Sequence, residues 1–112
     1  MKISTIVTTL SLTFCSSLVF ADNVLPYGAI KKGSWVNKKL AKDTMIGVAS
    51  KVATLGCSKP ESFKPYVMKN PQGKIGERVW WELWVVAGCN NKYPIKIRFN
   101  EKGSSSANWT IK

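Results

Sequence analysis

The pattern of apolar and polar positions predicts one amphipathic helix in the first half of the chain. Apolar residues recur at steps of four and three through residues 38–55, and the polar residues of this range fall mostly on the other side of the helix. Asn37 is a suitable N-cap, and Gly56 can take the left-handed conformation that ends a helix. Lys38 and Lys39 would oppose the helix dipole in the first turn, which favours a start nearer Asp43 as the alternative. The apolar stripe consists of Ala41, Met45, Val48, Val52 and Leu55, widened by Ile46, Ala49 and Ala53.

The second half of the chain has the pattern of antiparallel strands. Residues 77–87 and 93–100 form two clear strands, and residues 107–112 can form a last one. Residues 66–68 are expected to form only a short edge strand, because prolines interrupt this part of the chain. One helix followed by a three- or four-stranded antiparallel meander predicts an α+β fold, in which the helix covers one face of the sheet.

The register between the two clear strands decides which side chains face the core. Side chains alternate along a strand, so Trp81 lies on one face of its strand while its neighbours Trp80 and Glu82 lie on the other. A tight hairpin that turns at residues 90–91 would bury Glu82, and burial of an unpaired carboxylate is costly. A register shifted by one residue, with a loop over Gly88–Lys92, gives a continuous apolar face. That register pairs Val85 with Ile95, Leu83 with Ile97 and Trp81 with Phe99.

In this register the opposite, outward face carries aromatic and charged side chains. Tryptophan and arginine are the residue types that most often dominate protein interfaces. Three arrangements of this face are open: it is covered by an irregular N-terminal arm, residues 22–37, it binds a partner or a second copy of the chain across the sheet, or it holds a small ligand. The candidate partner-binding residues are Trp80, Glu82, Trp84, Lys96 and Arg98.

The first 21 residues have the layout of a secretory signal peptide. A lysine at position 2 precedes a run without charge, and Val19 and Ala21 occupy the −3 and −1 positions of a cleavage site. Cleavage after Ala21 leaves a mature chain of residues 22–112, with the folded domain over residues 38–112. We therefore expect a periplasmic or secreted protein.

The cysteine count agrees with export. Removal of the signal peptide takes away Cys15 and leaves Cys57 and Cys89. An even pair in an exported chain indicates one disulfide, which the small size of the domain makes useful. With no histidine in the chain and no Cys-x-x-Cys spacing, a redox or metal-binding role for the pair is disfavoured.

Charge and missing chemistry together favour binding over catalysis. The whole chain has a net charge of +11, which becomes +10 when Lys2 leaves with the signal peptide. Such a charge favours anionic partners. The lack of histidine excludes Ser–His and Cys–His nucleophiles, and the six acidic residues form neither a carboxylate pair nor a calcium loop. We expect no catalytic residues, metal or cofactor, and a non-enzymatic envelope protein that binds an acidic protein as an inhibitor, immunity or accessory factor. The alternative is a binder of anionic envelope polymer, lipid headgroups or extracellular nucleic acid.

Overall fold

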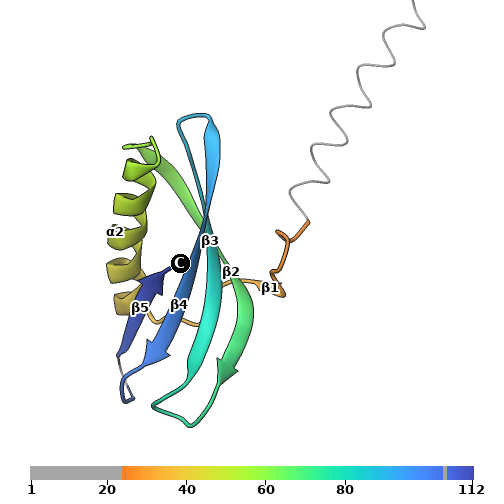
Figure 1. The fold of residues 1–112 in the computed structure, drawn as a ribbon, viewed down its shortest axis with the longest axis vertical. Coiled ribbons are helices and arrows are strands. Elements are labelled where there is room, and N and C mark those ends of the chain that lie inside the picture. Colours follow the sequence, from red (N-terminus) through yellow and green to blue (C-terminus); the bar gives the residue numbers. More distant parts are fainter. Residues whose placement is uncertain (1–23, 105) are drawn as a thin grey trace, which may run out of the picture.

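In the residues that the structure describes, one helix packs on one antiparallel sheet (Figure 1). The computed structural model describes residues 24–104 and 106–112, so the predicted signal peptide, its cleavage point and Cys15 lie outside the described residues. The sheet has five strands in the order β1-β2-β3-β4-β5, which confirms the α+β prediction and adds a strand to it. In the described part of the chain, no helix combines the length and apolar character that a membrane span requires. The elements are β1 (Lys31–Lys32), α2 (Lys38–Thr54), β2 (Pro60–Gln72), β3 (Val79–Gly88), β4 (Asn91–Glu101) and β5 (Ala107–Ile111).

Helix α2 lies within one residue of the predicted range 38–55, and it begins at Lys38 rather than nearer Asp43. The side chain of Asn37 accepts a hydrogen bond from the backbone N of Leu40 at 2.8 Å, which satisfies one of the free donors of the first turn. At the other end, Gly56 has a φ of +116°, the left-handed conformation that glycine adopts at low cost. The local capping chemistry therefore fixes both ends of the helix.

The buried line of α2 differs from the predicted stripe. Thr44 and Val48 are fully buried, whereas Met45 and Leu55 are 41% and 50% exposed. The cause lies on β5, because the ring of Trp109 occupies the space that a side chain at Gly47 would fill. The glycine therefore lets the helix approach β5, and the line that faces the core is rotated toward that strand.

Strand β2 is much longer than the predicted edge strand over residues 66–68. Strand β1 covers only two of its residues, so most of the outer edge of β2 has no partner strand. The carbonyl of Pro65 accepts a hydrogen bond from Gly33 N at 2.9 Å, on the side away from β3. In an antiparallel strand the N and C=O of one residue point to the same side, so the missing N–H of Pro65 removes no bond to β3.

The hairpin between β3 and β4 is tighter than predicted. Cys89 and Asn90 form a two-residue turn with φ values of 54° and 57°, and Gly88 pairs with Asn91. The predicted loop over residues 88–92 is therefore wrong, and the register moves by one residue. Because side chains alternate along a strand, this shift exchanges the two faces of β3.

The predicted disulfide between Cys57 and Cys89 is present. The Cα atoms lie 5.8 Å apart, and the bond joins the segment after α2 to the β3–β4 turn. Gly88 makes room for it, since a Cβ there would lie 2.9 Å from the carbonyl oxygen of Lys59 and 3.1 Å from the sulfur of Cys57. The disulfide thus holds the end of the helix at one end of the sheet.

Candidate binding surface

Glu82 is fully buried on the side of the sheet that α2 covers. Its Oε1 accepts hydrogen bonds from Trp84 Nε1 at 2.9 Å and from Ser34 Oγ at 2.7 Å. Its Oε2 accepts hydrogen bonds from Trp80 Nε1 and from the backbone N of Trp35, both at 2.8 Å. Hydrogen bonds to a charged acceptor are roughly twice as strong as neutral ones. These four donors replace the water that the carboxylate loses on burial.

The prediction that the five candidate residues share one exposed face is wrong. Trp80, Glu82 and Trp84 lie in the core under α2, where Trp80 stacks on Phe99 with ring centroids 5.1 Å apart. Sequence reasoning moved Glu82 outward because it counted the carboxylate as unpaired, but the flanking indoles and the N-terminal arm supply its partners. The structure therefore does not bring these three residues together with Lys96 and Arg98.

The N-terminal arm reaches both sides of the sheet. Ile30 N donates to the carbonyl of Val67 at 2.8 Å, which fixes the arm at the outer edge of β2. Beyond this edge, Ser34 and the Trp35 backbone bond to Glu82 on the helix side. Lys31 Nζ lies 4.3 Å from the centroid of the Trp35 ring. The arm is thus part of the fold, and it covers the outer edge of β2 rather than an exposed tryptophan face.

The face of the sheet away from α2, here called the open face, carries the exposed part of the predicted site. Arg98 lies opposite Trp81, and Lys96 lies opposite Leu83. The register and the alternation of side chains place an apolar row along β3, with lysines of β2 on one side and basic residues of β4 on the other. The apolar row consists of Val79, Trp81, Leu83, Val85 and Ala87, and the flanking cations are Lys64, Lys69, Lys92, Lys96 and Arg98.

Acidic side chains lie away from the middle of this face. Glu82 is in the core, and Glu101 points to the helix side at the end of β4. Asp43 is on α2, Glu77 lies in the turn before β3, and Glu61 lies at the irregular start of β2. Among the described residues, the rows that flank the centre of β3 are therefore uniformly positive.

Two hollows lie on the open face at different positions along β3. The first, here called the Val85 hollow, has a volume of about 260 Å³, and the second, the Trp81 hollow, has a volume of about 290 Å³. Each hollow combines an apolar β3 side chain, a lysine of β2, a lysine of β4 and part of the arm. The Val85 hollow is lined by Val24, Pro26, Ser62, Lys64, Tyr66, Val85, Ala87 and Lys92, and the Trp81 hollow by Gly28, Met68, Lys69, Trp81 and Lys96.

Sequence reasoning missed Trp81 and the β2 lysines as surface residues. It placed Trp81 in the core because the predicted register paired it with Phe99, and it did not extend β2 far enough to include Lys64 and Lys69. The residues on either side of Glu82 could have indicated that its carboxylate is buried. Residues two positions apart share a face, so Trp80 and Trp84 could each offer an indole N–H to that carboxylate.

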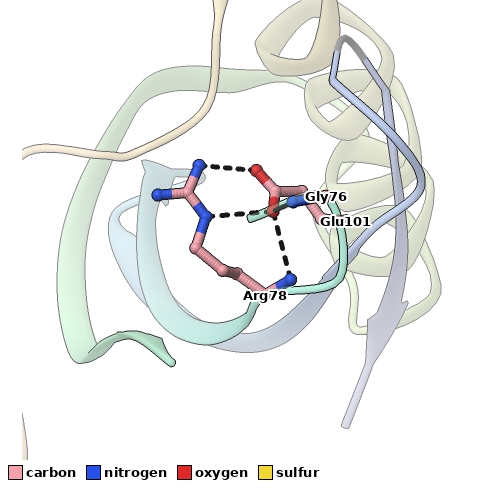
Figure 2. Close-up of polar contacts among 3 residues, drawn as sticks. All are labelled: Gly76, Arg78 and Glu101. Carbon is pink, nitrogen blue, oxygen red and sulfur yellow. Dashed lines mark hydrogen bonds and ion pairs between the residues drawn. The ribbon is translucent and has the colours of Figure 1, made fainter. Parts of the chain in front are cut away.

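An Arg78–Glu101 pair closes the opposite end of the β3–β4 hairpin (Figure 2). Arg78 Nη2 donates to Glu101 Oε2 at 2.7 Å and Arg78 Nε donates to Oε1 at 2.9 Å, while Gly76 N donates to Oε1 at 2.8 Å. The side-chain hydrogen bond from Arg78 is the main reason that the pKa of Glu101 falls from 4.5 to about 2. The same bond raises the pKa of Arg78. This two-pronged pair anchors the 76–78 segment to β4.

Within the described ranges, 24–104 and 106–112, no three His, Cys, Asp or Glu side chains gather in a way that could hold a metal ion. Comparisons with protein-family models, with curated proteins and with solved structures found no match. The function is therefore inferred from the residues and their geometry.

Proposed function

We propose that this protein is a small exported interaction protein without catalytic activity, and that its open face binds an acidic protein. Export to the periplasm or the outside of the cell is part of this proposal and is supported by the Cys57–Cys89 disulfide, since such bonds persist in oxidising compartments. An inhibitor, immunity or accessory factor would fit this description. The binding face differs from the one expected from sequence, although Lys96 and Arg98 belong to both.

The observation that carries the proposal is the arrangement of charge around an apolar row. Trp81, Val85 and Ala87 are partly exposed in the middle of the open face, and cations of β2 and β4 flank them. An apolar centre within a charged rim is typical of protein interfaces. A polymer of phosphates or sugar acids would use the cations and can stack on Trp81, but it would gain little from the aliphatic side chains of Val85 and Ala87.

A paired charge-reversal experiment tests the proposal. The tag-free mature protein is used to capture partners from the extracytoplasmic fraction of its source, in parallel with two double variants. Lys96→Glu/Arg98→Glu changes the open face, whereas Lys38→Glu/Lys39→Glu changes exposed lysines of α2 by the same net charge. We expect the first variant to lose its specific protein partner and the second to keep it.

Two other results would contradict the proposal. Equal loss of binding in both double variants, with a steep dependence on salt, would indicate an anionic polymer or lipid surface that responds to net charge rather than to position. Unchanged capture of the same acidic protein by Lys96→Glu/Arg98→Glu would show that the open face is not the binding surface.

A further inference from the structure

The two hollows of the open face share one arrangement, an apolar β3 side chain with a lysine of β2 and a lysine of β4 beside it. In the Val85 hollow, Lys64 from β2 and Lys92 from β4 lie on either side of an apolar floor. In the Trp81 hollow, Lys69 from β2 and Lys96 from β4 do the same beside Trp81. Each hollow can therefore accept an apolar side chain and place two ammonium groups beside a neighbouring carboxylate.

The spacing of the hollows follows from their place on one strand. Trp81 and the Val85–Ala87 pair are about five residues apart along β3, which is about 17 Å at a rise of about 3.4 Å per residue. Leu83, which lies between them, is buried and separates the two hollows along the strand. The face thus presents two separate apolar sites with cationic sides.

The N-terminal arm forms part of the wall of each hollow. Val24 and Pro26 line the Val85 hollow, and Gly28 lines the Trp81 hollow. The hydrogen bonds of Ile30 and Gly33 to β2, and of Ser34 and Trp35 to Glu82, anchor residues 30–35 of the arm, directly after the segment that lines the hollows. This anchor limits the positions that the lining segment can take, which lowers the entropy cost of holding a ligand.

We infer that the open face recognises an acidic protein segment through two apolar anchor side chains about 17 Å apart, one in each hollow, with carboxylates beside each anchor. This inference rests on the proposed function and specifies the partner. A second copy of the chain does not fit, because every copy carries a net positive charge and would meet a positive face. Carboxylates, by contrast, complement all four lysines that line the hollows.

Fluorescence anisotropy with synthetic labelled peptides tests the inference on the mature protein. The first peptide has two Phe-Glu units with their phenylalanines six residues apart, joined by glycine and serine, so that both rings lie on the same side of an extended chain. The second replaces one phenylalanine with serine, and the third replaces every glutamate with glutamine. Because the second anchor binds intramolecularly, we expect the first peptide to bind on the order of a hundredfold more tightly than the second. The third peptide should bind no better than the second.

Charge reversal of one hollow at a time supplies the matched variants. Lys64→Glu/Lys92→Glu and Lys69→Glu/Lys96→Glu each alter exposed side chains of one hollow and leave the other unchanged. Each variant should bind the two-anchor peptide only as tightly as the wild type binds the one-anchor peptide. Lys38→Glu/Lys39→Glu, with the same change of charge on α2, should bind the two-anchor peptide within a few-fold of the wild type.

The outcomes separate this inference from the proposed function. If the one-anchor and two-anchor peptides bind equally well, or no peptide binds, the two-anchor mode is wrong, even if capture of an acidic protein through Lys96 and Arg98 succeeds. If the peptides bind as expected but capture does not depend on the open face, the hollows bind acidic segments and the assigned protein partner is wrong.

Discussion

Replacement of Glu82 by glutamine should be among the most destabilising single changes in the protein. The carboxylate accepts four hydrogen bonds, two on each oxygen, and is fully buried. A glutamine amide keeps one oxygen and presents an NH₂ group in place of the other, so two of the four donors lose their acceptor. A hydrogen bond to a charged group contributes about 1.5–3 kcal/mol, which gives a loss of about 3–6 kcal/mol. A domain of this size has a total stability of only about 4–14 kcal/mol.

Equilibrium unfolding in urea, followed by tryptophan fluorescence, measures this loss. Glu61→Gln is the matched control, because Glu61 is exposed and makes no side-chain hydrogen bond among the described residues. Ser34→Ala removes one of the four donors to Glu82, together with the acceptor of the exposed Val36 N–H, and should cost about 1.5–3 kcal/mol. A Glu82→Gln protein within about 1 kcal/mol of the wild type, with the same dependence on urea, would refute the assignment of Glu82 as the central acceptor of the core.

Three further changes test other parts of the packing. Gly47→Ala should lower the free energy of unfolding by about 1 kcal/mol, because overlap of the new methyl group with Trp109 outweighs the gain in helix propensity. A stabilised variant would contradict this contact. Thr44→Val should raise the free energy of unfolding by about 1 kcal/mol, because the buried Thr44 hydroxyl has no hydrogen-bond partner among the described residues. A loss of stability would show that this hydroxyl is hydrogen-bonded. The pKa of Glu101 is lowered from 4.5 to about 2 in the folded protein, so its pair with Arg78 stabilises the fold above about pH 4.5 and loses this effect as the pH falls toward 2. Arg78→Gln should therefore weaken the pH dependence of unfolding in this window, and identical acid-unfolding curves for variant and wild type would count against the pair.

Local chemistry was sufficient to predict the helix and the disulfide. Asn37 and Gly56 mark the ends of α2 through hydrogen bonds and φ values that depend only on neighbouring residues. The residues of the helix that are buried could not be predicted as well, because the rotation of the helix about its axis depends on the contact between Gly47 and Trp109 of a distant strand. A periodic pattern shows that a helix has an apolar side, but a partner element selects which part of that side is buried.

The register of β3 against β4 could not be chosen from alternation alone. Both faces of β3 are largely apolar, so the position of Glu82 became the deciding feature. Two of its four donors come from Ser34 and Trp35, which lie 48 and 47 residues away in the sequence. The two indole donors, by contrast, were visible at positions 80 and 84. A buried carboxylate is costly only if it lacks partners, and partners on the same face should be counted before it is moved to the surface.

Of the five predicted site residues, only Lys96 and Arg98 lie on the open face, because their orientation does not depend on the register. From Ile95 to Phe99, strand β4 alternates between apolar and basic residues, so Lys96 and Arg98 face away from the core in either pairing. The shift replaced Trp80 and Trp84 by Trp81 beside these cations, and the full length of β2 added Lys64 and Lys69. Glu82 is connected to the surface in another way, because the arm that it holds through Ser34 and Trp35 continues into the wall of both hollows. The carboxylate of Glu82 thus supports the open face from the opposite side of the sheet and is not a member of that face.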